Sequence, residues 1–228
     1  MENNLKAKLM EAENAVKRCL AAKGFYASSL NYAGQYWLRD LVFSLQTLLQ
    51  LGYGEKVKAH LNLFVEAYRR RGEVPAVVFE HGTLTLIAAS LRMLVKPSLL
   101  RAYPLSFALP NLFGRGLQTW TGDSAILLLI GLHEYSEASS DQSMLENFKE
   151  EALGLLQGLL KMAGQEGLLT GSGWMDAMAN YVGQPNLVLQ ILFYKALRLY
   201  GFKAEAEGLK EQIQDCLLYT SPSPRDRG

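Results

Sequence analysis

The chain has 228 residues, of which 49% are hydrophobic and 20% charged, a balance typical of a folded domain with a sizeable core. Its 22 acidic residues nearly cancel its 23 basic ones, so no broad positive field is available for the phosphates of nucleic acid. The longest apolar run, 125–132, is far shorter than the roughly 20 residues that cross a bilayer, and the charged first segment differs from a signal peptide. We therefore expect a cytoplasmic protein that binds neither nucleic acid nor a membrane.

Helical periodicity dominates the chain. Apolar residues recur at spacings of three and four, and no run alternates for long as a strand would, so the predicted class is all-α. A first helix is expected with an apolar face that ends at the Lys23-Gly24 pair; this face consists of Leu5, Leu9, Ala12, Val16 and Cys19. A second helix over 37–49 stops at the glycines of 52–54, and a third over 57–68 returns antiparallel, so these two form a helical hairpin.

The middle and end of the chain continue this pattern. Residues 72–82 are predicted as a loop, 84–94 as a fourth helix, and three prolines make the connection over 95–119 irregular. A fifth, very apolar helix starts at Asp123 or Ser124, a sixth runs from Asp141 or Ser143 to about 163, and two more cover 186–199 and 204–215. Apolar helices thus alternate with amphipathic ones, as in two concentric layers, although periodicity alone favours a generic helical bundle or repeat.

The last segment differs from the rest. Residues 216–226 resemble one reading frame of a transposase-type sequencing adapter, and they interrupt the eighth helix in mid-pattern. We expect 216–228 to be a non-native tail, the alternative being a native tail rich in serine and proline. Without Cys216 the chain keeps one thiol, Cys19, which at an apolar helical position is expected to be a small core residue.

Three sites carry the strongest functional signal. Each of the three tryptophans stands two or three residues before an aspartate, at the expected start of a helix: Trp37 before Asp40, Trp120 before Asp123, and Trp174 before Asp176. An indole ring packs on the C–H face of a sugar, while carboxylates and guanidinium groups bind its hydroxyls, so the pairing suits carbohydrate. For Asp123, and to a lesser degree for Asp40, a plain helix N-cap is the alternative.

These motifs resemble the (α/α)6 six-hairpin glycosidases, closest to glucoamylases and to the amylo-α-1,6-glucosidase domain of glycogen debranching enzymes. The resemblance is carried by three pairs of stretches. The first pair is Gly24-Phe25-Tyr26-Ala27-Ser28-Ser29 with Tyr36-Trp37-Leu38-Arg39-Asp40, and the second is Thr121-Gly122-Asp123-Ser124-Ala125 with His133-Glu134-Tyr135. The third pair is Gly173-Trp174-Met175-Asp176-Ala177 with Leu192-Phe193-Tyr194-Lys195-Ala196-Leu197. The resemblance covers about residues 24–200. It implies that 1–215 is the first part of one (α/α)6 domain, antiparallel helical hairpins forming about half of the toroid.

The resemblance also implies roles. Asp176 would be the general acid of an inverting glycosidase acting on α-glucans or related oligosaccharides, and Arg39 and Asp40 would hold the hydroxyls of the sugar being cleaved. The remaining substrate contacts are assigned to Trp37, Trp120, Asp123 and Trp174. The catalytic base of such enzymes belongs to the second half of the toroid, so the chain as written is expected to be inactive. No metal or cofactor is expected; the partner is an oligosaccharide or polysaccharide, and uncovered apolar helix faces favour self-association.

One departure and two alternatives stay open. Where the family carries Val-Glu-Ile-Asn before its last motif helix, this chain has Leu187-Val188-Leu189-Gln190, so a sugar-binding glutamate is replaced by Val188. The toroid also hosts sugar epimerases and polysaccharide lyases, which use histidine or tyrosine as acid and base. A helical scaffold that binds a partner and catalyses nothing is the third possibility, and it would bury the tryptophans fully.

Overall fold

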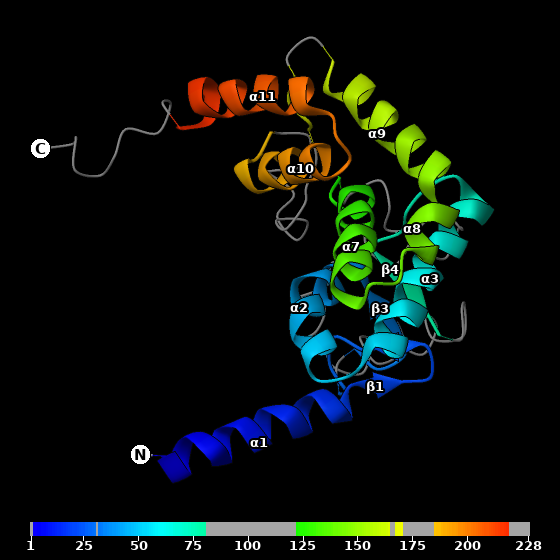
Figure 1. Cartoon of the computed structure of the whole chain (residues 1–228), viewed down its shortest axis with the longest axis vertical. Coiled ribbons are helices and arrows are strands. Elements are labelled where there is room, and N and C mark those ends of the chain that lie inside the picture. The colour runs from blue at the N-terminus through cyan, green and yellow to red at the C-terminus, as the bar shows by residue number, and fades with distance from the viewer. Residues whose placement is uncertain (1, 31, 81–121, 165–166, 171–184, 219–228) are drawn as a thin grey trace, which may run out of the picture.

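The computed structural model describes residues 2–30, 32–80, 122–164, 167–170 and 185–218, with the backbone alone given for 2–5 and 216–218. The described chain is mostly helical, in agreement with the sequence (Figure 1). Its helices are α1 (Glu2–Arg18), α2 (Leu38–Gln50), α3 (Gly54–Arg71), α7 (Ser124–Ser139), α8 (Ser143–Asn147), α9 (Lys149–Ala163), α10 (Leu187–Leu199) and α11 (Lys203–Gln212), the last continued by a π-helical turn, Ile213–Leu218. The predicted fourth helix and the prolines after it lie outside the described residues.

Helix α7 forms the centre of the described structure. It contacts α2 and α3 at one end and α10 at the other, and α10 packs on α11 (Figure 1). Its sequence is apolar on all sides, which is the pattern of a helix enclosed by its neighbours, and its turns from Ile126 to Leu132 are buried throughout. Gly131 lies where α2 and α3 approach, since a Cβ there would come within 3.0 Å of side-chain carbons of Val42 and Leu61.

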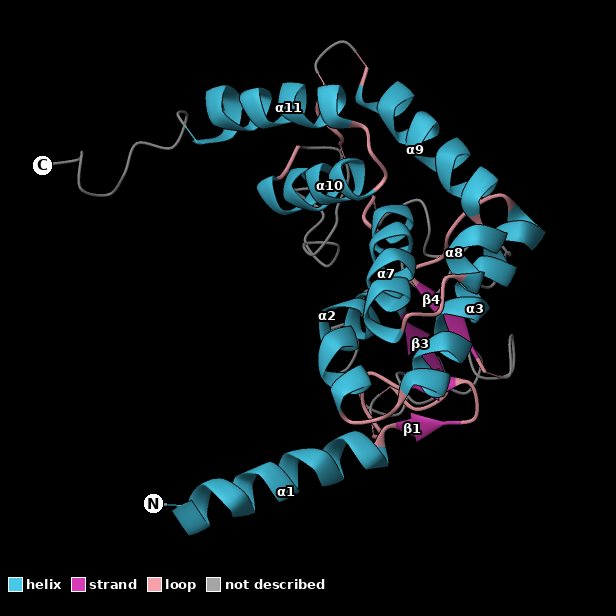
Figure 2. Cartoon of the chain, viewed as in Figure 1, coloured by secondary structure: helices cyan, strands magenta, loops and turns pink. Residues whose placement is uncertain are grey.

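Two small antiparallel sheets were not predicted (Figure 2). β1 (Leu20–Ala21) pairs with β2 (Gly24–Phe25), and β3 (Gln35–Trp37) pairs with β4 (Val77–Phe79). Strands of two or three residues are too short to show alternation. The expected loop over 72–82 is therefore wrong at Val77–Phe79, and the first helix ends at Arg18 rather than at Lys23-Gly24.

Helix α1 does not bury the face that its sequence predicts. Residues 6–15 are exposed, Leu9 is 62% exposed, and α1 extends away from the rest of the chain (Figure 1). Only its last turn joins the core, where the partly buried Val16 packs against it, as Leu20 does just beyond the helix. Cys19, just beyond the helix, is half-buried, so the expectation of a core thiol is met only in part.

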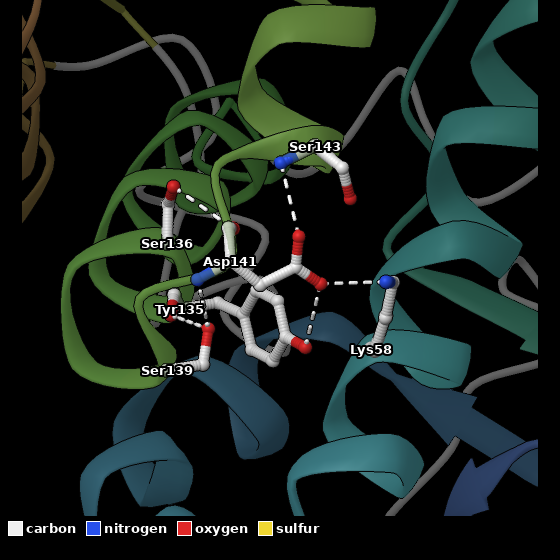
Figure 3. A network of polar contacts seen from close by, with 6 residues as sticks. All are labelled: Lys58, Tyr135, Ser136, Ser139, Asp141 and Ser143. Atoms are coloured by element: carbon white, nitrogen blue, oxygen red, sulfur yellow. Dashed lines mark hydrogen bonds and ion pairs between the residues drawn. The ribbon is translucent and has the colours of Figure 1, made fainter.

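The turn between α7 and α8 is fixed by polar contacts that also reach α3 (Figure 3). The carboxylate of Asp141 accepts a 3.0 Å hydrogen bond from the backbone N–H of Ser143 and pairs with the Lys58 ammonium at 2.6 Å. These contacts hold the pKa of Asp141 well below its usual range, the Lys58 bond being the largest cause. The predicted sixth helix begins here as expected, but it is split because Phe148 leaves the helical path and is buried in the core at 1% exposure.

Candidate functional site

Arg39 and Asp123 meet although 84 residues separate them. Arg39 stands in the first turn of α2, and Asp123 directly precedes α7. The Arg39 guanidinium binds one carboxylate oxygen of Asp123, Oδ2, through Nε at 2.9 Å and through Nη2 at 2.9 Å. The two side chains are 15% and 4% exposed, so the ion pair is nearly closed off from water. The structure thus joins the first predicted motif to the second.

Asp123 occupies the N-cap position of α7 without capping it. Its side chain makes no hydrogen bond to the first backbone N–H groups of the helix, so the plain N-cap interpretation is wrong for this carboxylate. Its other oxygen, Oδ1, is buried and has no hydrogen-bond partner among the described residues. Burial raises the pKa of Asp123, and the neighbouring Arg39 opposes that rise. A buried carboxylate oxygen without a donor is costly, which makes it a strong acceptor for a hydroxyl that can reach it.

Trp37 and Asp40 flank Arg39 and are more accessible. Trp37 ends β3, is half-buried, and donates its indole N–H to Gln35 Oε1 at 3.1 Å. The ring of Tyr32 meets it edge to face, with centroids 5.9 Å apart. Asp40 is exposed in the first turn of α2, yet the protein atoms near its carboxylate raise its pKa, while Arg39 acts to lower it. Aromatic, cationic and anionic groups therefore occur together within four residues.

Trp174 and Asp176 of the third motif lie outside the described residues, as does Trp120 of the second. The chain on either side of 171–184 is described and is firmly held. The buried side chain of Gln190 accepts from the Leu169 backbone N–H at 3.0 Å and donates to the Leu169 carbonyl at 2.7 Å. A β-bridge joins Thr170 to Pro185. The two ends of the segment that carries Trp174 and Asp176 are thus drawn together, against α10.

Loss of this clamp, the pair of hydrogen bonds between Gln190 and Leu169, should lower the stability of the fold measurably. Gln190→Leu keeps most of the side-chain volume but leaves two buried backbone groups of Leu169 without partners, so we expect the free energy of unfolding to fall by about 2–3 kcal/mol. Urea denaturation measures this, and hydrogen exchange of the Leu169 amide should accelerate. Gln46→Leu, at an exposed position of α2, is the matched control and should change stability by less than about 0.5 kcal/mol. Equal effects of the two substitutions would refute the clamp.

Two features of the site region were missed from the sequence. Glu80 accepts hydrogen bonds from the hydroxyls of Tyr26 and Tyr36, the latter at 3.0 Å. Burial is the largest cause of the raised pKa of each tyrosine, and the contact with Glu80 adds to it. The second feature is His60, which is buried on α3 behind Tyr36. Only the pairing of β3 with β4 brings Glu80 to Tyr36, and that pairing leaves no signal in the sequence.

The described residues offer no group of three or more histidine, cysteine, aspartate or glutamate side chains that could hold a metal ion. None of the described helices combines the length and the apolar character that crossing a bilayer requires. Comparisons with protein-family models, with curated proteins and with solved structures gave no match, so the resemblance to six-hairpin glycosidases rests on the sequence motifs alone.

Proposed function

We propose that this chain is part of a glycoside hydrolase of the six-hairpin (α/α)6 type, which binds an α-glucan or a related oligosaccharide and cleaves it with inversion. In this proposal Arg39 and Asp40 hold the hydroxyls of the sugar to be cleaved, Trp37 packs on its C–H face, and Asp176 protonates the leaving oxygen. The helices α2, α3, α7 and α10 would belong to the first hairpins of the toroid.

The observation that carries the proposal is the ion pair between Arg39 and Asp123. Two motifs chosen for their sugar-binding chemistry stand far apart in the sequence, yet their charged side chains are in contact. A generic helical bundle gives no reason for a largely buried arginine to meet a buried aspartate at the start of its central helix, because such pairs rarely add net stability. Trp37, only half-buried, fits ligand binding better than the role of a core residue.

The geometry suggests a separate role in sugar binding for each of these groups. Since Asp123 Oδ2 binds the guanidinium, Arg39 is held in one orientation. Asp123 Oδ1 is buried, so a sugar hydroxyl would reach it only after the atoms that cover it move aside. Asp40 supplies a second, more accessible acceptor. Inverting hydrolysis needs two carboxyl groups about 6.5–9.5 Å apart, one as acid and one to activate water. The proposal assigns only the acid, and the resemblance assigns the base to the second half of the toroid.

Sugar binding is expected to depend on Asp40. We expect maltotriose or isomaltotriose to bind in the millimolar range, and Asp40→Asn to weaken binding about tenfold, because a charge-assisted hydrogen bond to a hydroxyl is worth about 1.5 kcal/mol. Isothermal titration calorimetry measures the affinities. Glu55→Gln is the matched control, since Glu55 is an exposed carboxylate in the first turn of α3, as Asp40 is in α2. Binding that Glu55→Gln weakens as much as Asp40→Asn would contradict the site.

The same preparation should bind the sugar without hydrolysing it. Because the proposal gives no residue of this chain the role of catalytic base, glucose release from maltose or isomaltose should stay at the level of the buffer blank. Release that is measurable, and that Asp176→Asn abolishes, would show that this chain supplies both carboxyl groups and would overturn that part of the proposal.

A further inference from the structure

Helix α1 presents an apolar stripe that the rest of the described structure covers only at its last residue, Val16. Leu9, Ala12 and Val16 follow one another at spacings of three and four, the narrow seam of a coiled coil. Leu9 and Ala12 are exposed, and Val16 is half-buried at the end where α1 joins the rest of the chain. The helix extends outward from that end (Figure 1).

A lone helix of this kind is marginal in water. Isolated helices shorter than about 12–15 residues are marginal even with alanine-rich sequences. α1, with 17 residues, is only slightly longer and contains three asparagines and a β-branched valine, which form helices poorly. Most helical stability in proteins comes from packing of an apolar face. The stripe therefore has the pattern of a helix-packing surface, and a partner helix packed on it would stabilise α1.

We propose that the partner is α1 of a second copy of this chain, packed antiparallel about a two-fold axis between residues 10 and 11. This register sets the large Leu9 of each copy against the small Ala12 of the other. Such large-to-small layers fill the space between two helices, whereas a parallel pair would set Ala12 against Ala12 and leave a gap.

The charges beside the stripe fit the same arrangement. Lys6 and Glu13 lie on one flank of the stripe, seven residues apart. In the antiparallel pair Lys6 of each copy approaches Glu13 of the other, so the symmetry creates two attractive contacts. Glu13 already pairs with Lys17 on its own helix at 2.9 Å, and its side chain remains 46% exposed, so it is accessible to a second cation.

The position of the rest of the chain also favours the antiparallel pair. α1 joins it at the helix C-terminus, so a parallel pair would force two folded bodies together just after residue 18, while the antiparallel pair sets them at opposite ends. The seam is short and buries less than the roughly 1,000 Å² of stable interfaces. We expect a weak dimer, with a dissociation constant on the order of 100 µM.

Sedimentation equilibrium of the whole chain over micromolar to millimolar concentrations tests this proposal. Leu9→Lys should weaken dimerisation by about tenfold or more, since it removes a central apolar contact and brings two like charges near the axis. Met10→Lys is the matched control: Met10 is 56% exposed and lies about 100° around the helix from Leu9, outside the stripe. It should leave the dissociation constant within about twofold. Circular dichroism and thermal melting check that both variants keep the fold.

Charge exchange and oxidation test the register. Lys6→Glu and Glu13→Lys should each weaken the dimer several-fold, and the double variant should restore it. Cys19 follows the last turn of α1, so an antiparallel pair keeps the two thiols at opposite ends and mild oxidation should give no Cys19–Cys19 cross-link through this interface. A monomer at every concentration, a dimer that Leu9→Lys does not weaken, or an efficient Cys19 cross-link that Leu9→Lys abolishes would overturn the proposal.

Discussion

Replacing one member of the Arg39–Asp123 pair should destabilise the fold far more than replacing both. Arg39→Met leaves a carboxylate that is 4% exposed without its cation, and removing one partner of a buried pair typically costs about 3–5 kcal/mol. The double variant Arg39→Met/Asp123→Leu removes both charges, so its free energy of unfolding should lie within about 1–2 kcal/mol of the wild type. A double-mutant cycle by urea denaturation at neutral pH yields the coupling energy, which should exceed about 2 kcal/mol.

The pH dependence of the single variant adds a second check. Burial raises the pKa of Asp123 even with Arg39 present, and the loss of Arg39 raises it further. A carboxyl group whose folded-state pKa exceeds its unfolded value binds its proton more tightly when folded, so stability is lost as pH rises through the folded pKa. Relative to the wild type, Arg39→Met should therefore recover stability as the pH falls from neutral toward the unfolded-state pKa of about 3.9. Additive single-variant effects with no such recovery would mean that the pair is not coupled.

Acid should destabilise the protein through His60, beginning below about pH 6.5. The side chain is 1% exposed, and burial lowers its pKa to about 3. Its Nδ1 accepts a 3.4 Å hydrogen bond from the Phe25 N–H, which a protonated ring could not do. Between the folded and unfolded pKa values only the unfolded chain takes up this proton, so stability falls as pH drops, by about 1.4 kcal/mol per pH unit from this residue.

His60→Asn isolates this contribution. The asparagine oxygen can replace Nδ1 as the acceptor for Phe25 but does not titrate. At pH 7.5 the variant should be less stable by about 1–3 kcal/mol, because the ring contacts with Tyr36 and Phe64 are lost. By pH 5 the difference should shrink by about 2 kcal/mol. Parallel pH profiles of wild type and variant between pH 7 and pH 5 would contradict a neutral buried His60.

The sequence predicted best the elements whose signal is local. The run 125–132 is apolar on every side, and the corresponding helix α7 is buried at the centre of the described structure. Asn186 was expected at the start of a helix, and its side chain accepts from the Leu189 N–H as an N-cap should. In both cases the determining residues lie within a few positions of the element they define.

The sequence-based predictions that were wrong concern features that depend on contacts between distant residues. Phe148 fits a helical pattern, but its ring is buried in the core and the helix is interrupted at this residue. The β3–β4 pairing joins segments some forty residues apart, so it could not be predicted from either segment alone. For the site, the sequence singled out Arg39 and Asp123, but it did not predict their direct contact or the enclosed position of His60.

Chemical-shift mapping of a bound sugar tests the proposed site most directly. The ¹⁵N-labelled chain would be titrated with isomaltotriose and, separately, with maltotriose. We predict that the indole N–H of Trp37 and the backbone amides of Arg39, Asp40 and Asp123 shift together, with one dissociation constant in the millimolar range. Signals that do not move at saturating sugar, or that move only on elements distant from the start of α2, would contradict the proposed carbohydrate site.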